Sequence, residues 1–170
     1  TLLQVISGFQ SASEGQVDFI SSGNKTDPSK WHEQISYAAP YLDVPEAYTF
    51  EELILFQRKF KPLAQQLTTG EIIKISGLSG IEQKAIKHYS SGMKQRIKLT
   101  LAVLSAVPVL LLDEPLSNLD ERGVEWYKLL IEEHTRGKTI IVCSNNIENE
   151  IFFCHRNIDI HHYKQDSTGL

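Results

Sequence analysis

The stretch YSSGMKQRIKLTLAVLSAVPVLLLDEPLSNLD, residues 89–120, decides the fold of this chain. Its first half predicts a helix from about Ser91, because four apolar residues share one helix face: Met93, Ile97, Leu101 and Leu104. Its second half contains an unbroken apolar run at 109–112, which Asp-Glu-Pro closes. A run this short and this apolar is typical of a strand buried on both faces. The stretch therefore predicts a helix that leads into a buried parallel strand.

Strands and helices are expected to alternate on both sides of this stretch. Alternating polarity predicts a strand at 16–20. Strands are also expected at 35–39, which is mostly apolar, at 139–143 (a second buried strand) and at 158–163. Helical spacing predicts helices at 1–7, 124–134 and 147–154, and a series of helical segments from Phe50 to about residue 88. Alternating strands and helices are typical of an α/β sheet, here divided by an inserted helical segment.

Composition narrows the possible functions. The 170 residues fit one domain, and 41% hydrophobic with 22% charged residues is ordinary for a globular protein. A net charge of −4 gives no general attraction to nucleic acid, so we expect no nucleic-acid partner. The two cysteines are too few for a disulfide scaffold and have no metal-ligand spacing, which favours a cytoplasmic setting. The apolar run 99–112 is interrupted by polar residues and is more typical of a core than of a membrane span.

Two adjacent carboxylates follow the predicted buried strand. Ligands of open α/β sheets bind outside the carboxyl ends of strands, where Asp113 and Glu114 are expected to lie. Asp113 could hold Mg²⁺ through water, and Glu114 could polarise a water for attack on a γ-phosphate. Without other motifs, a solvated pair that merely ends a strand would be the better interpretation.

A second candidate site opens the predicted helix at residue 91. Ser90, Ser91 and Gly92 offer backbone N–H groups and hydroxyls at the positive end of the helix dipole, a combination that binds anions. The alternative is a common serine N-cap with a glycine nearby. The serine-glycine segment, the helix, the strand with its two carboxylates and SNLD at 117–120 follow one another in a combination that rarely occurs by chance.

At these residues the sequence resembles the nucleotide-binding domain of ATP-binding cassette (ABC) proteins. YSSGM at 89–93 resembles the family's signature motif, VLLLDEP at 109–115 its Walker B strand, and SNLD its D-loop. TFEEL at 49–53 resembles the start of its helical subdomain. The resemblance implies a P-loop NTPase-like parallel sheet, with a core at 1–47 and 96–170 and a helical subdomain at about 48–95.

The resemblance also implies a mechanism. Family members form head-to-tail dimers that enclose two ATP molecules with Mg²⁺, so Ser90, Ser91 and Gly92 would act on the nucleotide of a second ABC subunit. Asp113 would hold the metal and Glu114 would be the catalytic base. Asp120 would link the two sites, and it could also be the N-cap of the next helix. The cofactors implied are ATP and Mg²⁺.

The sequence departs from the family pattern in three places. The glycine-rich phosphate loop and the strand before it are absent, so the chain is expected to be a truncated sequence that does not hydrolyse ATP alone. Pro40 stands where the family has the glutamine of its Q-loop. Asn145 stands where the family has a histidine after the strand TIIVC; asparagine can hydrogen-bond a phosphate but takes up no proton at neutral pH.

Three functions remain open. The first is the ATPase subunit of an ABC transporter, located on the inner face of the plasma membrane. The transporter would be an exporter with a separate transmembrane permease subunit. Pro115 and the short helical insert favour it over DNA-repair relatives. The second is a soluble ABC protein that acts on ribosomes, although SNLD lacks the histidine expected there. The third is a non-catalytic cassette that completes a partner's ATP site, which Pro40 and Asn145 favour and Glu114 disfavours.

Overall fold

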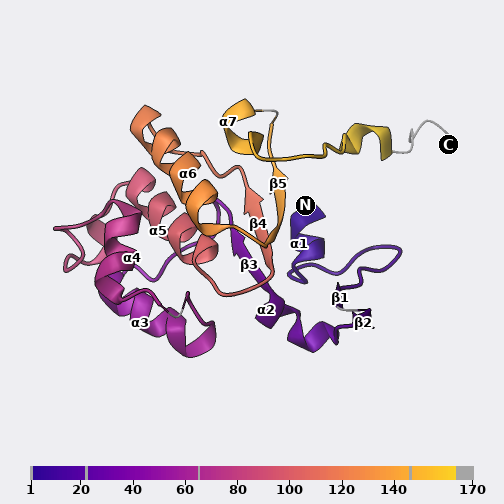
Figure 1. The fold of residues 1–170 in the computed structure, drawn as a ribbon, viewed down its shortest axis with the longest axis horizontal. Coiled ribbons are helices and arrows are strands. Elements are labelled where there is room, and N and C mark those ends of the chain that lie inside the picture. The colour runs from indigo at the N-terminus through magenta and orange to yellow at the C-terminus, as the bar shows by residue number, and fades with distance from the viewer. Residues whose placement is uncertain (1, 22, 65, 146, 164–170) are drawn as a thin grey trace.

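A three-stranded parallel sheet lies at the centre of the molecule (Figure 1). The structure is a computed structural model that describes residues 2–21, 23–64, 66–145 and 147–163. The strands are β3 (Ile35–Ala38), β4 (Val109–Asp113) and β5 (Thr139–Cys143), in the order β3-β4-β5. Ala38 pairs with Leu112, and Asp113 pairs with Cys143, so the three carboxyl ends lie at one edge of the sheet. The predicted α/β fold with a parallel sheet is confirmed.

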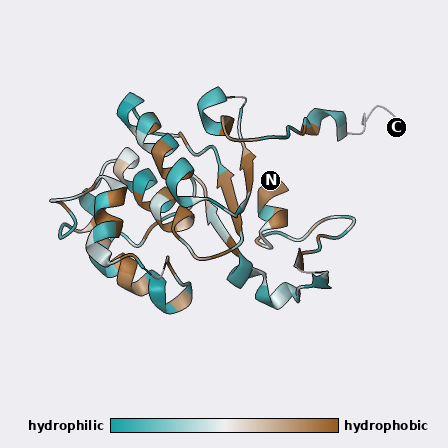
Figure 2. Cartoon of the chain, in the orientation of Figure 1, coloured by the Kyte–Doolittle hydropathy of each residue, from teal (hydrophilic) through white to brown (hydrophobic). Residues whose placement is uncertain are grey.

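The side chains of β4 alternate between two apolar layers. Leu110 and Leu112 pack against the helices α5 (Ser91–Val103) and α6 (Glu121–His134). Leu111 points to the opposite face and contacts Leu3 of α1 (Leu2–Ile6). All three leucines are fully buried, as expected for a strand with helices on both faces. Figure 2 shows the apolar strands between these helices.

A helical layer packs on the other side of α5. It consists of α3 (Phe50–Phe60), α4 (Thr69–Ser76) and the short 3₁₀ helix η2 (Ile86–His88). Both α-helices begin with a capping box, Thr49 with Glu52 and Thr68 with Glu71, which satisfies N–H groups that the first turn leaves unpaired. The predicted helical insert is therefore present, but residues between its helices are turns and extended segments.

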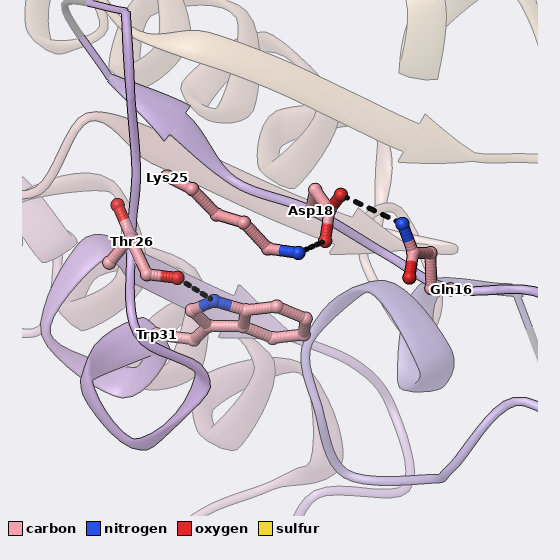
Figure 3. A network of polar contacts seen from close by, with 5 residues as sticks. All are labelled: Gln16, Asp18, Lys25, Thr26 and Trp31. Carbon is pink, nitrogen blue, oxygen red and sulfur yellow. Dashed lines mark hydrogen bonds and ion pairs between the residues drawn. The ribbon is translucent and has the colours of Figure 1, made fainter.

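The predicted strand at 16–20 is wrong. Only Ile20 is in a strand, β1 (Ile20–Ser21), which pairs antiparallel with β2 (Asn24–Lys25). Side chains hold this segment instead (Figure 3): Lys25 forms an ion pair of 2.7 Å with Asp18, and the Trp31 indole donates to the Thr26 carbonyl at 3.3 Å. The segment then continues into η1 (Pro28–Lys30) and α2 (Trp31–Gln34), which leads to β3. Residues 16–19 alternate in polarity as a strand would. Among the described strands, however, none pairs with them, so no ladder of strand hydrogen bonds forms.

Two predictions near the C-terminus also fail. Residues 158–163 form no strand: they end in the exposed 3₁₀ helix η3 (Ile160–Tyr163), where Asp159 accepts a hydrogen bond from the His161 N–H at 2.9 Å. β5 is only half-buried, because no strand among the described residues pairs with its outer edge. The helix predicted at 147–154 is present but short, as α7 (Glu148–Ile151). No helix in the described ranges has the length and apolar character needed to cross a membrane.

Candidate functional site

The carboxyl edge of β4 and β5 brings three of the predicted site residues together. Asp113 ends β4, and the N–H of Glu114 donates to the Cys143 carbonyl at the end of β5, at 2.9 Å. Glu114 Oε1 accepts a hydrogen bond of 2.9 Å from Asn145 Nδ2. This contact directs the Glu114 side chain toward Asn145 at the carboxyl edge of the sheet.

The backbone at Glu114 is unusual. Its φ of 41° lies in the left-handed region, which a residue with a side chain adopts only when its surroundings require it. The chain turns sharply here, so Glu114 leaves the sheet while Asp113 stays within it. The two adjacent carboxylates thus make different contacts, as expected for a pair with different roles.

Asp113 is nearly buried and accepts hydrogen bonds from two tyrosines. Its side chain is 9% exposed, and its Oδ2 lies 3.0 Å from the Tyr41 hydroxyl and 3.3 Å from the Tyr37 hydroxyl. The two hydroxyls also hydrogen-bond each other. Burial, the bond to Tyr41 and the charge of Asp113 all raise the pKa of Tyr37, so this phenol remains a proton donor. Sequence reasoning missed both tyrosines.

Buried contacts hold the loop that follows Glu114. Glu150 of α7 is 1% exposed, and its Oε1 accepts a hydrogen bond of 3.1 Å from the Leu116 N–H. The Tyr127 hydroxyl of α6 donates to the Glu150 carbonyl at 3.1 Å, and Gln95 Nε2 of α5 donates to the Pro115 carbonyl at 2.9 Å. Three helices therefore fix residues 115–116, and with them the position of Glu114. The sequence pattern did not indicate a role for Glu150, because its helix was expected from apolar residues alone.

The N-terminus of α5 is arranged differently. Ser90 is the N-cap, with its hydroxyl accepting from the Met93 N–H at 3.2 Å, whereas Ser91 is exposed. A Cβ added to Gly92 would lie 2.7 Å from the Asn118 carbonyl oxygen, so only glycine permits this approach of the helix to the loop. Asn118 itself has a left-handed φ of 65°. The helix end and the SNLD loop are thus in direct contact.

Asp120 is an N-cap, as one interpretation of the sequence predicted. Its Oδ1 accepts from the Gly123 N–H at 2.8 Å at the start of α6. Among the residues that the structure describes, no hydrogen bond or ion pair joins Ser90, Ser91 or Asp120 to the carboxylates Asp113 and Glu114. The predicted site residues therefore form two separate groups within one chain.

A groove of about 330 Å³ runs beside the second group. Ser91, Lys94 and Asn118 line one side of it, and the segment from Pro40 to Glu46 lines the other. Lys98 also lines it and donates to the carbonyls of Ala39 and Pro40 at 3.1 and 2.8 Å, and burial lowers the pKa of this ammonium. Pro40 thus contributes its backbone oxygen here and has no side-chain group to offer.

The residues at the edge of the sheet fit a magnesium ion that keeps most of its water. Across the described ranges, no cluster of three or more His, Cys, Asp or Glu side chains could enclose a metal. Mg²⁺ needs no such cage, since it is commonly bound by one or two carboxylates together with substrate phosphates. Asp113 meets this requirement at the carboxyl edge, and Glu114 lies next to it.

Comparisons with known proteins agree with this geometry. The chain is 28% identical over 135 residues to the cytochrome c biogenesis ATP-binding export protein CcmA of Yersinia pseudotuberculosis, covering 79% of the chain and 62% of that relative. It is 30% identical over 126 residues to the uncharacterized ABC transporter ATP-binding protein YybJ of Bacillus subtilis, covering 74% of the chain and 57% of the relative. The chain therefore spans about three fifths of these relatives.

Solved structures share the fold. A putative ABC transporter ATP-binding protein from Pyrococcus furiosus superposes with a TM-score of 0.67 at 20% identity, over 86% of this chain and 72% of that one. A dimeric ATP-binding cassette in a post-hydrolysis state, bound to ADP and phosphate, gives a TM-score of 0.71 at 19% identity, over 89% and 71% of the two chains. The P-loop NTPase-like α/β fold is thereby confirmed.

The family model described as ABC transporter matches residues 1–117, which include the signature, the Walker B strand and the first residue of SNLD. This match covers more than half of the chain. The two groups of site residues, the fold and the match agree, and the chain belongs to the ABC transporter family.

Proposed function

We propose that this chain is part of an ATP-binding and ATP-hydrolysing subunit of an ABC transporter. The observation that carries the proposal is the hydrogen bond of 2.9 Å from Asn145 to Glu114 at the carboxyl edge of the sheet, beside Asp113. A carboxylate that accepts this hydrogen bond, next to a second carboxylate that could hold a metal ion, supports the proposal, because water attack on a phosphate requires such a pair.

Each residue at this edge has a separate role in the proposal. Asp113 holds Mg²⁺ through water, and the ion would neutralise charge on the phosphates of ATP when bound. Glu114 accepts the proton of the attacking water. Asn145 replaces a histidine and orients Glu114 by donating through Nδ2, and it transfers no proton itself.

The second group of residues would complete the ATP site of another ABC subunit in a head-to-tail dimer. Ser91 is exposed at the end of a helix of 13 residues, and no contact within the described chain ties it to the carboxylates. Ser90 and Gly92 shape that helix end, and Asp120 anchors the loop that joins the two groups. An outward-facing anion site without its own phosphate partner supports a role across an interface.

The core and the helical subdomain would divide as the sequence suggests, at 1–47 with 96–170 and at about 48–95. α5 supports this division, because its side chains contribute to two different apolar clusters. Ile97 and Leu101 pack with α3 and α4, whereas Leu99 and Val103 pack with the sheet. The division lies within one continuous helix, so the two parts share a rigid connection.

The transport role rests on the relatives. CcmA is named an ATP-binding export protein, which supports an exporter. In this proposal the ATPase subunit lies on the inner face of the plasma membrane and works through a separate transmembrane permease subunit. Copurification of the protein with a membrane protein is the expected result. Copurification with ribosomes would favour the soluble alternative.

ATP hydrolysis by the protein at its natural length tests the proposal. Glu114→Gln should lower kcat by about 100-fold or more, because it removes the general base. Glu148→Gln is the matched control, since Glu148 is exposed on α7 and should leave kcat unchanged. A protein that binds ATP but hydrolyses none would favour the third function, a non-catalytic cassette that completes a partner's site. Pro40 and Asn145 are the residues that favour it.

A further inference from the structure

The segment after β3 lacks the side chain that the ABC family is expected to place there. Pro40 has no hydrogen-bonding side chain, and its carbonyl oxygen accepts from Lys98 at 2.8 Å. A glutamine in this place would offer both an acceptor oxygen and donor N–H groups to the metal end of the site. The question is which residue of this chain fills that space.

Tyr41, the next residue, reaches the place in question. Its hydroxyl lies 3.0 Å from Asp113 Oδ2, although the two residues are 72 positions apart in sequence. Tyr37 reaches the same oxygen at 3.3 Å, and the two hydroxyls hydrogen-bond each other. A phenol hydroxyl is both donor and acceptor, so it can hold a carboxylate and still accept a hydrogen bond from a metal-bound water.

The two tyrosines differ in how they are held. Tyr37 belongs to β3, whose pairing with β4 sets its position opposite Leu111, and its ring also contacts Phe9 at a centroid distance of 6.1 Å. Tyr41 is 49% exposed and lies in the turn after the strand, against the edge of the Tyr37 ring at 6.4 Å. Tyr37 is therefore held within the sheet, and Tyr41 is the tyrosine at the exposed end of the pair.

We propose that Tyr41 takes over the position of the missing glutamine: its hydroxyl, supported by Tyr37, orients the Asp113 carboxylate and thereby holds the divalent cation of a bound nucleotide. This inference rests on the proposed function, because it assigns a positioning residue to the same ATP site. It also links that site to the groove, since Tyr41 directly precedes Leu42, Asp43 and Val44, which line it.

Terbium luminescence tests this inference without measuring hydrolysis. Tb³⁺ replaces Mg²⁺ at oxygen ligands, and its emission rises when a tyrosine close to the ion absorbs the exciting light. The experiment titrates Tb³⁺ into the protein at its natural length with saturating ADP. The unchanged protein should give strong ADP-dependent emission, and excess Mg²⁺ should compete it away.

Two substitutions separate the chemical role from the presence of a ring. Tyr41→Phe should raise the Tb³⁺ concentration at half-saturation about 10-fold, the lower end of the effect of removing a partner of a metal ligand. Tyr41→Gln should keep half-saturation near that of the unchanged protein while lowering the maximum emission. Tyr163→Phe is the control, because Tyr163 is 76% exposed in η3 and should change neither quantity.

Any other result contradicts either the role of Tyr41, its replacement of the glutamine, or the proposed function. If Tyr41→Phe leaves half-saturation unchanged in a protein that binds Tb³⁺ and ADP, the tyrosine does not position the metal site and this inference alone fails. If Tyr41→Gln is as impaired as Tyr41→Phe, the substitution for glutamine is wrong. If the unchanged protein gives no ADP-dependent emission, nucleotide binding fails, and the proposed function fails with it. Thermal unfolding of each variant verifies that it is folded.

Discussion

The two groups of site residues differ in how much of their surroundings one chain supplies. At the edge of the sheet, Asp113 and Glu114 have partners from β3, from the loop after β5 and, through residues 115–116, from α5 and α7. At the N-terminus of α5, Ser90 and Gly92 are used by the helix and its neighbouring loop, and Ser91 faces outward. The first group is held by contacts within the chain, whereas the second includes an exposed residue, Ser91, that is available to something outside the chain.

In the second group of residues, the largest effect on hydrolysis is expected at Ser91. Ser91→Arg places a long charged side chain where the nucleotide of another subunit would lie, so ATP hydrolysis should fall by about 100-fold, as for the loss of a donor to a charged transition state. Stability should not change, because the side chain is exposed. Steady-state hydrolysis and urea unfolding measure the two quantities. Ser79→Arg, in an exposed turn, should leave both unaltered.

Gly92 tests the contact between the helix end and the SNLD loop. Gly92→Ala places a Cβ 2.7 Å from the Asn118 carbonyl oxygen, so the loop must move. We expect a loss of about 1–3 kcal/mol in the free energy of unfolding, together with lower hydrolysis. Gly70→Ala is the matched control: Gly70 lies in α4 with open space around its Cβ position, so alanine should stabilise the protein slightly. Equal stability of the two variants would contradict the close approach.

A substitution at Glu150 tests whether its contact with the loop after Glu114 holds Glu114 in position. Glu150→Ala leaves the half-buried Leu116 N–H without its carboxylate acceptor, which should lower the free energy of unfolding by about 1–3 kcal/mol. Because residues 115–116 follow Glu114, kcat should fall as well, with little change in KM. Glu148→Ala on the same helix should stay within about 0.5 kcal/mol of the original, as exposed positions do. A rise in KM with an unchanged kcat would argue against a role of Glu150 in positioning Glu114.

Of the three substitutions to alanine that should lower stability, at Gly92, Glu150 and Asp120, the one at Asp120 should have the smallest effect. Asp120→Ala removes the acceptor for the Gly123 N–H and should lower the free energy of unfolding by about 1 kcal/mol, measured by urea unfolding. Asp120→Asn retains the cap and should restore stability. If the asparagine variant is stable but hydrolyses ATP more slowly, Asp120 has a role in the site beyond the cap; if alanine is as stable as aspartate, the cap contributes nothing.

The sequence predicted the parts of the fold that depend on local pattern. The helix at 91–103 and the strand at 109–113 follow from helical spacing and from an unbroken apolar run, and both patterns reflect burial that the structure has. Residues 16–20 and 158–163 have similar local patterns but form no strand of that length, because a strand also needs a neighbour to pair with. β5 is likewise only half-buried because none of the described strands pairs with its outer edge.

Site residues could be predicted where polar side chains stand at the carboxyl ends of predicted parallel strands. Asp113, Glu114 and Asn145 follow adjacent strands, so their meeting at one edge follows from a parallel sheet. Tyr41 and Glu150 could not be found in this way. Tyr41 meets Asp113 only because β3 pairs with β4 in one register, and Glu150 is a charged residue in a short helix that gives no sign of being buried.

Mixing two inactive variants tests the central claim most directly, namely that the two groups of one chain serve different ATP sites. Glu114→Gln and Ser91→Arg proteins are purified separately, shown to be inactive, and then mixed so that subunits exchange. In a head-to-tail dimer the mixed pair has one intact site, so hydrolysis should recover to about a quarter of the original rate, since half of the dimers are mixed. No recovery, in a mixture shown to contain mixed dimers, would mean that both groups act within one chain and would contradict the account.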